Sequence, residues 1–502
     1  MLLIYPPVAK PTEPPPGIAL LAGALQGQNC PVEIIDANIE GLEYLINKPA
    51  LQDDTWTKRA KKNACAHLNS LRDNRTYLNP ARYQRCIADL NRALNQTTER
   101  ATISVSNYVD GEFSSVSSHD LLAAAAAPEK NPFYDYFSPR LQQALSSSRH
   151  EHIGFSLNYL SQAVVTFAMI GHVRRIAPQI TIVLGGGLIT SWMRHPNWSN
   201  PFAALVDRCI DGPGERALLN HCGIAVNHST ALADYSQLPL ERYWSPSLIL
   251  PYAASRGCYW NRCSFCPERA EQNRYTSAGA NQNLDELHQL CQRWQPGLVH
   301  LLDNAISPAL LDGLIQRPLG VNWYGFARVN ERLTDLDYCR ALKKAGCVLL
   351  KLGIESGDDQ VLAQMEKGVT SALTEKVLTT LKQAGLATYV YLLFGTPGET
   401  PQAAEHTLTF IRRNHAAVTF LNLAIFNLPT NSSDAQQLAL RPFYQGDLSL
   451  YSDFEHPYGW NRGDVRRFLE KTFKKDPAIA AILRRDPPQM TSNHAPFFVE
   501  GC

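Results

Sequence analysis

The sequence predicts an α/β protein in which a doubly wound, Rossmann-type N-terminal domain precedes a partial (β/α)6 barrel and a short C-terminal extension. The first observation is that the opening forty residues read strand, helix, strand, as a doubly wound domain does. The second is a steady alternation of apolar strands and amphipathic helices from about residue 249. The third is a repeat: "LKKAG" at 342 recurs as "LKQAG" at 381, each a helix end closed by glycine before an apolar strand.

The length of 502 residues also exceeds what a single core can bury. We therefore expect an N-terminal domain at 1–235, the barrel at 249–430 and the extension at 431–502.

The N-terminal domain is predicted in order along the chain. A strand "LLIY" is followed by the Pro-rich loop "PPVAKPTEPPPG", a helix rich in small residues, and a second strand "PVEIIDAN". The pattern resumes with a strand at 152–160, a helix at 161–176 and the strand "ITIVLGGG" at 180–187. Between the halves, about 42–150 reads as a helical insertion. Both an ordered fold and partial disorder are compatible with the Ser- and Ala-rich stretch 100–130.

Six strands are expected in the barrel, each followed by a helix or a polar loop. They lie in the segments "SLILPYAAS", "LVHLLDN", "VNWYGFARV", "CVLLKLGIESG", "LATYVYLLFGTPGE" and "AVTFLNLAIFNL". In a barrel of parallel strands, chemistry belongs at the carboxyl ends of the strands.

The composition excludes several classes of protein. Hydrophobic residues make up 45% and charged residues 19%, and the formal net charge is +1. A balance of this kind gives no basic surface for nucleic acid or for an anionic membrane. No apolar run approaches the roughly 20 residues that span a bilayer, and the start "MLLIYPPVAKP" lacks the basic region of a signal peptide. We expect a cytoplasmic protein without a membrane span.

Three of the twelve cysteines are clustered, namely Cys258, Cys263 and Cys266. With no secretory signal, a disulfide framework is not expected. A structural zinc site needs four ligands, and no second Cys-x-x-Cys is present. A redox pair would use Cys263 and Cys266 alone. Three thiolates in one short loop suit a [4Fe–4S] cluster with one open iron, which we favour over the zinc site and over inert cysteines.

The loop "RGCYWNRCSFC" resembles the signature loop of the radical S-adenosylmethionine (radical SAM) enzymes. The family usually has three residues between the first two cysteines, and here there are four, Tyr259 to Arg262. Phe265 before the last cysteine fits the family. The resemblance covers about 249–425. It implies that S-adenosylmethionine is bound by Phe265 and by residues at successive strand ends: Asp303, Asn304, Arg328, Glu355, Ser356, Gly395 and Pro397.

The N-terminal half is similar to the cobalamin-binding domain that precedes many radical SAM domains. The resemblance implies that Ser156 and Gly185, Gly186 and Gly187 approach the cofactor, with cobalamin as a candidate second cofactor. The first loop has no histidine to ligate cobalt. "DANIEG" at 36–41 has the spacing of the cobalt-ligand motif with Asn for His, but it follows the second strand, and we treat the match as coincidental.

The expected function is that of a radical SAM enzyme. It would cleave S-adenosylmethionine reductively to a 5′-deoxyadenosyl radical, with cobalamin for methyl transfer or rearrangement of a small-molecule or natural-product substrate. The alternatives are hydrogen abstraction without cobalamin and a non-catalytic iron–sulfur or zinc protein. An electron donor such as flavodoxin or ferredoxin is implied as a partner. No catalytic residue is assigned. His494 in "SNHAPFF" belongs either to an apolar C-terminal segment that docks on the barrel or to a cover of the barrel mouth, and Cys502 is expected to be a free thiol.

Overall fold

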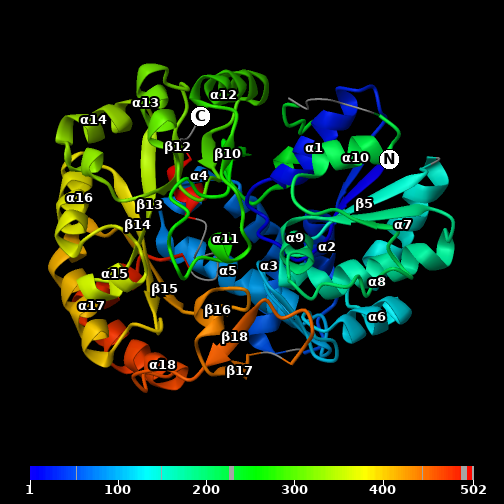
Figure 1. Ribbon diagram of the computed structural model, residues 1–502. Coiled ribbons are helices and arrows are strands. Elements are labelled where there is room, and N and C mark those ends of the chain that lie inside the picture. Colours follow the sequence, from blue (N-terminus) through cyan, green and yellow to red (C-terminus); the bar gives the residue numbers. More distant parts are fainter. Residues whose placement is uncertain (53, 149, 225–230, 444, 488–493, 500–502) are drawn as a thin grey trace. The chain divides into compact units, whose positions relative to one another are not determined.

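The computed structural model describes residues 1–502 except 53, 149, 225–230, 444, 488–493 and 500–502, so Cys502 lies outside the described residues (Figure 1). The chain forms two compact units. The first contains Met1–Leu248 together with residues 445–450. The second contains Ile249–Phe443, Tyr451–Pro487 and the C-terminal residues 494–499. We describe each unit by itself.

The first unit is a doubly wound α/β domain, as the sequence predicts. Its main sheet has five strands, all parallel, in the order β2-β1-β5-β6-β7. Figure 1 shows α1 and α10 on one side of this sheet and α8 on the other. The chain leaves β1 and β5 toward opposite edges, so the crevice at their carboxyl ends is the topological switch point, where open α/β sheets bind ligands.

Helices and strands of the first unit have the following bounds: β1 (Leu2–Tyr5), α1 (Pro16–Gln26), β2 (Glu33–Asp36), α2 (Ala37–Asn47), α3 (Thr55–Leu71), α4 (Asn74–Tyr77), α5 (Pro80–Asn95), β3 (Ala101–Ile103), β4 (Tyr108–Asp110), α6 (Ser118–Ala126), η1 (Pro128–Lys130), α7 (Tyr134–Ser147), β5 (His152–Ser156), α8 (Leu160–Ile176), β6 (Thr181–Gly185), α9 (Gly187–Met193), β7 (Arg208–Cys209), α10 (Gly214–His221) and η2 (Leu240–Arg242).

The insertion between β2 and β5 is mostly helical, and the stretch 100–130 has regular structure. It contains the hairpin β3–β4 and helix α6, which carries the alanine run and packs against α8. At Gly171 of α8, a Cβ would stand 1.9 Å from the carbonyl oxygen of Ala125. Small residues let the two helices approach closely. The stretch therefore lacks the pattern of large apolar residues by which a helix is recognised in a sequence.

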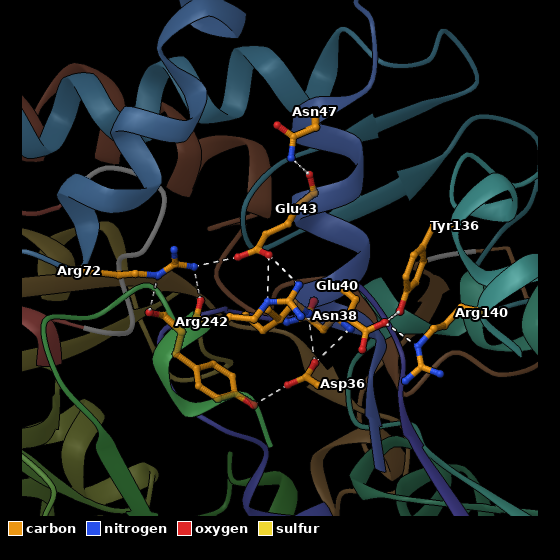
Figure 2. A network of polar contacts seen from close by, with 11 residues as sticks. Asp36, Asn38, Glu40, Glu43, Asn47, Arg72, Tyr136, Arg140 and Arg242 are labelled. Atoms are coloured by element: carbon orange, nitrogen blue, oxygen red, sulfur yellow. Dashed lines mark hydrogen bonds and ion pairs between the residues drawn. The ribbon is translucent and has the colours of Figure 1, made fainter. Parts of the chain in front are cut away.

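A network of charged and polar side chains connects the insertion to the end of β2 (Figure 2). Asp36 accepts hydrogen bonds from the backbone N–H groups of Asn38 and Ile39, both at 3.1 Å, which caps α2. It also accepts one from the hydroxyl of Tyr243 at 2.5 Å. Burial raises the pKa of Asp36 to about 6.

Two glutamates on α2 extend this network. Glu43 accepts from the guanidinium groups of Arg72 (2.8 Å) and Arg242 (2.6 Å). Glu40 accepts from Tyr136 (2.8 Å) and Arg140 (3.1 Å). Arg72 and Tyr136 come from opposite ends of the insertion, so α2 is the element on which it is anchored, as Figure 2 shows.

The second unit is the partial barrel that the sequence predicts. Six parallel strands lie in the order β15-β14-β13-β12-β11-β8, so every strand pairs with its neighbour along the chain. Gly346 (φ 95°) and Gly385 (φ 73°) end the two "LK-x-AG" helices in the left-handed conformation that favours glycine. At Gly346 a Cβ would also stand 2.7 Å from the carbonyl oxygen of Val321. The β/α repeat therefore ends its helices as predicted.

Helices and strands of the second unit have the following bounds: β8 (Ile249–Tyr252), β9 (Ser255–Arg256), α11 (Pro267–Ala270), β10 (Thr276–Ser277), α12 (Ala280–Trp294), β11 (Leu298–Leu301), α13 (Pro308–Gln316), β12 (Trp323–Ala327), η3 (Glu331–Thr334), α14 (Leu336–Lys344), β13 (Cys347–Glu355), α15 (Asp359–Gln364), α16 (Ser371–Gln383), β14 (Ala387–Phe394), α17 (Pro401–Asn414), η4 (His415–Ala417), β15 (Phe420–Ile425), β16 (Leu428–Pro429), η5 (Asp434–Gln436), β17 (Leu440–Pro442), β18 (Tyr451–Phe454), α18 (Arg462–Lys471), η6 (Phe473–Lys475), α19 (Pro477–Leu483) and η7 (Ala495–Phe498).

The C-terminal segment 494–499 packs at the amino ends of the barrel strands. His494 is fully buried, and its ring centroid lies 4.3 Å from that of Tyr389 and 4.1 Å from that of Phe420. Ala495 and Val499 join the same apolar cluster as Ile249 and Leu298, the first residues of β8 and β11. The segment therefore docks on the barrel, as the first of the two alternatives predicts, and at the end opposite to the carboxyl ends of the strands.

Within the described part of the chain, no helix combines the length and the apolar character that crossing a membrane requires.

Candidate functional site

The three clustered cysteines lie in a loop closed by a short antiparallel pair. Strands β9 and β10 pair through Arg256 with Thr276 and Ser255 with Ser277, and the loop runs between them. Gly257 has φ 71°, and a Cβ there would stand 2.8 Å from the carbonyl oxygen of Arg274. Only glycine fits at this corner without strain. Cys266 precedes α11, and its N–H donates to the carbonyl oxygen of Cys263 at 3.3 Å.

The structure places the middle cysteine of the loop near the other two. Cys263 lies close enough to both Cys258 and Cys266 for the charges of the thiolates to interact. Burial raises the pKa of Cys263, although the nearby positive charges of Lys367 and Arg328 counteract the rise. Burial also raises the pKa of Cys266 to about 11. Without a metal these two thiols hold their protons, and coordination to iron would deprotonate them.

The donor set fits a cubane cluster better than a single ion. Among the described residues, no three His, Cys, Asp or Glu side chains lie close enough to one another to hold one metal ion. A structural zinc site requires such a group of four. In a [4Fe–4S] cluster each thiolate ligates a different iron, so three thiols spread over one loop meet its requirement.

The residues at the ends of β11 and β13 have different surroundings. The carboxylate of Asp303 accepts from the N–H of Ala254 at 3.1 Å and from the hydroxyl of Ser255, so it holds the chain where it enters the cysteine loop. Asn304 is exposed. The hydroxyl of Ser356 lies 3.1 Å from that of Thr407 and accepts from the N–H of Asp358, also at 3.1 Å. Asp303 and Ser356 therefore satisfy backbone and side-chain groups of the barrel itself.

Glu355 adopts a strained backbone conformation at the end of β13. Its φ is 68°, and the pairing of β13 with β14 is irregular between Gly353 and Glu355. A non-glycine residue in this region costs free energy, and such strain is found preferentially at functional sites. The carboxylate accepts from the ammonium of Lys367 at 2.8 Å, and both side chains are nearly buried.

The loop from Gly395 to Glu399 is held by the C-terminal extension. Glu399 is fully buried, and its Oε2 accepts from the N–H of Gly395 (2.5 Å) and from the indole N–H of Trp460 (2.9 Å). Nε2 of His456 donates to the carbonyl oxygen of Thr396 at 2.8 Å. Oε1 of Glu399 is buried without a hydrogen-bond partner, and burial raises the pKa of this carboxyl to about 7. Gly398 is required by packing, because a Cβ there would stand 1.6 Å from Oε1 of Gln364.

Several residues at this end of the barrel were not predicted from the sequence. Trp260 packs under the guanidinium of Arg328, and Lys367 pairs with Glu355. Deeper in the barrel, the ammonium of Lys351 lies 3.2 Å from Nε2 of His300. The only signal for Lys351 was a lysine within the apolar strand "CVLLKLGIE". Trp260, Lys367 and Trp460 gave no local signal, because their partners are distant in the sequence.

In the first unit, Ser156 and the three glycines lie at the carboxyl ends of β5 and β6. Asn158 connects them: its amide donates to the hydroxyl of Ser156 at 3.0 Å and accepts from the N–H of Gly187 at 3.0 Å. Gly186 has φ 116°, and a Cβ there would stand 2.3 Å from the carbonyl oxygen of Leu157, so the fold itself requires this glycine.

Gly185 and Gly187 are different. A Cβ would meet no atom closer than 3.7 Å at Gly185 or 3.8 Å at Gly187. Packing of the protein does not explain these two glycines, because a Cβ at either position would make only ordinary van der Waals contacts.

The loop between β1 and α1 contains no histidine and is firmly held. Asn38 accepts from the N–H of Ala9 (2.8 Å) and donates to the carbonyl oxygen of the same residue (3.0 Å). The amide of Gln162 donates to the carbonyl oxygen of Pro6 at 2.7 Å. Asn38, the third residue of "DANIEG", therefore holds the loop that faces the switch point. This motif has a structural role.

Replacing Asn38 by alanine is expected to lower the free energy of unfolding by about 2 kcal/mol, because it leaves the buried N–H and C=O groups of Ala9 without partners. Asn47 on the same helix is the control. Its amide donates to the carbonyl oxygen of Glu43 at 2.8 Å and accepts a weak 3.6 Å bond from the thiol of Cys65, both near the surface, and N47A should cost about 0.5 kcal/mol or less. Urea unfolding of the full chain measures both. Equal values for the two variants would contradict this role of Asn38.

Residues 252–411 match the Radical SAM superfamily. Curated relatives include an uncharacterized methyltransferase of Pyrococcus horikoshii, 26% identical over 36% of this chain and 41% of that protein. The anaerobic magnesium-protoporphyrin IX monomethyl ester cyclase of Rubrivivax gelatinosus is 24% identical over 48% of this chain and 50% of that protein. The bacteriochlorophyllide d C-12(1)-methyltransferase of Chlorobaculum tepidum is 26% identical over 48% and 54%. The chain thus spans about half the length of the curated relatives it matches.

Over most of its length the chain has a fold similar to that of a solved structure, the radical S-adenosylmethionine methyltransferase TsrM from Kitasatospora setae with cobalamin and a [4Fe–4S] cluster bound. The TM-score is 0.54 at 16% identity, over 87% of this chain and 77% of that one. The similarity shows that both units share their fold with that protein. The matched segment carries the three clustered cysteines and the parallel strands β11 to β14, so the chain contains a radical SAM domain.

Proposed function

We propose that the protein is a radical SAM enzyme that holds a [4Fe–4S] cluster on Cys258, Cys263 and Cys266 and binds cobalamin on its N-terminal sheet. The observation that carries the proposal is a loop of three electrostatically linked thiols at the carboxyl ends of parallel strands, next to two cations and a strained glutamate. A three-thiolate cluster leaves one iron free for a substrate ligand.

The residues around the loop divide into two roles. Phe265, Asn304, Arg328, Glu355, Gly395 and Pro397 are the proposed contacts of S-adenosylmethionine. Asp303 and Ser356 are proposed to act indirectly, because their side chains are occupied by Ala254 and Thr407. When bound, the reduced cluster supplies the electron that cleaves S-adenosylmethionine, and cobalamin supplies a carrier for a methyl group. The chain itself binds, orients and excludes water from the reacting groups.

Methyl transfer to a small-molecule or natural-product substrate is the reaction we propose. Methyltransferases are named among the curated relatives and in the similar solved structure. The ring closure named for the cyclase of Rubrivivax gelatinosus is the second candidate. Flavodoxin or ferredoxin is the proposed electron donor.

Anaerobic reconstitution of the full chain with ferrous iron and sulfide tests the cluster. We expect about four iron and four sulfide per chain, and a dithionite-reduced EPR signal that changes when S-adenosylmethionine is added. Production of 5′-deoxyadenosine or S-adenosylhomocysteine would support catalysis. About one zinc per chain without iron, or an EPR signal that does not change when S-adenosylmethionine is added, would contradict the proposal.

Cobalamin binding is tested at Gly185 and Gly187. The variants G185A and G187A should unfold within about 0.5 kcal/mol of the wild type, because a methyl group has room at both positions. We expect each to weaken cobalamin binding about tenfold, since the methyl group occupies the space proposed for the cofactor. Retention of corrinoid, measured by absorbance after gel filtration, reports the effect. Wild-type protein that retains no corrinoid would instead favour hydrogen abstraction without cobalamin.

A further inference from the structure

The four-residue interval between Cys258 and Cys263 contains a tryptophan that is packed into the body of the barrel. The indole N–H of Trp260 donates to the carbonyl oxygen of Glu366 at 3.2 Å. Its ring lies against Gly368, where φ is 67° and a Cβ would stand 2.3 Å from Cζ2 of the indole. The interval is therefore held in place by one large side chain. Trp260 packs at a fixed position on the barrel, and the absence of a side chain at Gly368 leaves room for its ring.

Trp260 in turn supports the guanidinium of Arg328. The guanidinium carbon lies 3.7 Å from the centroid of the Trp260 ring, which is a stacked cation–π contact. Arg328 also donates to the carbonyl oxygen of Lys367. Its third partner is the side chain of Cys263, the middle cysteine of the loop. Arg328 thus has contacts on three sides, and one of them is a proposed cluster ligand.

Two cations act on Cys263, Lys367 and Arg328, and Arg328 supplies the main positive charge because that of Lys367 is neutralised by a carboxylate. Lys367 lies close to Cys263 but forms an ion pair with Glu355 at 2.8 Å. Arg262 lies over the same Trp260 ring, with its guanidinium carbon at 5.1 Å from the centroid. A guanidinium remains charged at all physiological pH values. A fixed positive charge beside a cluster ligand stabilises the reduced, more negative cluster.

We propose that Arg328 raises the reduction potential of the cluster and that Trp260, supplied by the long interval, is the residue that positions Arg328 for this. The inference rests on the proposed function, since it requires the cluster. It differs from the expectation that Arg328 only contacts S-adenosylmethionine, because it assigns an effect that is present before S-adenosylmethionine binds. It also gives a role to a residue of the four-residue interval.

An EPR-monitored redox titration of the reconstituted full chain, without S-adenosylmethionine, tests the proposal. R328Q should lower the equilibrium constant for reduction about tenfold, a shift of about 59 mV to more negative potential for a one-electron couple. W260L should shift the potential in the same direction by a smaller amount, because the aromatic face that holds the guanidinium is lost. R262Q is the matched control and should leave the potential nearly unchanged, since Arg262 lies over the same ring but is exposed to solvent, which screens its charge.

The outcomes separate the inference from the function on which it rests. If the wild type assembles no cluster, the proposed function fails. If R328Q and W260L carry full iron and sulfide and titrate as the wild type does, the redox role is wrong although the function stands. A shift in R328Q without one in W260L would remove the positioning role of Trp260. Should R328Q fail to assemble the cluster, W260L decides alone, and an unchanged potential in it overturns the proposal.

Discussion

Replacing any one of Cys258, Cys263 and Cys266 by alanine is expected to abolish the cluster and reduce the cleavage of S-adenosylmethionine at least about 100-fold. Each thiol is the sole proposed ligand of one iron, and among the described residues no group of three His, Cys, Asp or Glu side chains offers another metal site. The measurements are iron and sulfide content after anaerobic reconstitution and the yield of 5′-deoxyadenosine under dithionite.

The matched control is C65A. Cys65 is exposed on α3 of the insertion, in the other unit, and its thiol donates a weak 3.6 Å bond to Oδ1 of Asn47. It should retain the cluster and the activity of the wild type. Normal iron and sulfide content in C258A, C263A or C266A would remove that cysteine from the ligand set.

Replacing Glu399 by glutamine is expected to stabilise the protein at pH 8 relative to the wild type and to have little effect at pH 4.5. Burial raises the pKa of Glu399 from 4.5 to about 7 in the folded protein. Between these two pH values the unfolded chain releases a proton that the folded chain retains. The free energy of unfolding therefore falls as the pH rises, and the loss is complete above about pH 7.

The size of this effect follows from the difference between the two pKa values. At about 1.4 kcal/mol for each pH unit, the folded wild type loses about 3 kcal/mol across the window. Glutamine keeps an acceptor for the N–H groups of Gly395 and Trp460 but never ionises. The advantage of E399Q over the wild type should thus grow by about 3 kcal/mol between pH 4.5 and pH 8.

Urea unfolding at several pH values measures this difference, with E405Q as the control. Glu405 is exposed on α17, the helix that follows Glu399, and its replacement should give the same pH dependence as the wild type. A difference between E399Q and the wild type that is constant over pH 4.5–8 would show that the carboxyl of Glu399 ionises normally in the folded protein.

Much of the fold could be predicted because it depends on patterns among residues that are close together in the sequence. The strand–helix alternation of both units and the glycine ends of "LKKAG" and "LKQAG" depend on residues that are neighbours in the sequence. The helix opened by Thr400 and Pro401 is a further case, since Thr400 accepts from the N–H of Ala403 at 3.2 Å. The stretch 100–130 was ambiguous for a related reason. Its helix is recognisable only through the close contact of Ala125 with Gly171, which lies 46 residues away.

The strand-end positions of the candidate site were also predictable, whereas the partners of their side chains were not. The sequence indicates that Asp303 follows a strand, but its hydrogen bonds go to Ala254 and Ser255, about 50 residues earlier. Glu399 pairs with Trp460, 61 residues later. Neither partner is marked by any local pattern, because the pairing depends on how the barrel and the extension fold together.

The sequence by itself determined the order of strands and helices, the cysteine loop and the end of the barrel at which polar residues gather. Each of these follows from periodicity and spacing along the chain. Only the tertiary structure decided which charges surround Cys263, that Trp260 supports Arg328, and that the C-terminal segment lies at the amino ends of the strands. The physical reason is that electrostatic and packing energies depend on distances in space. In a parallel barrel those distances are set by strand register and curvature, which join residues far apart in the chain.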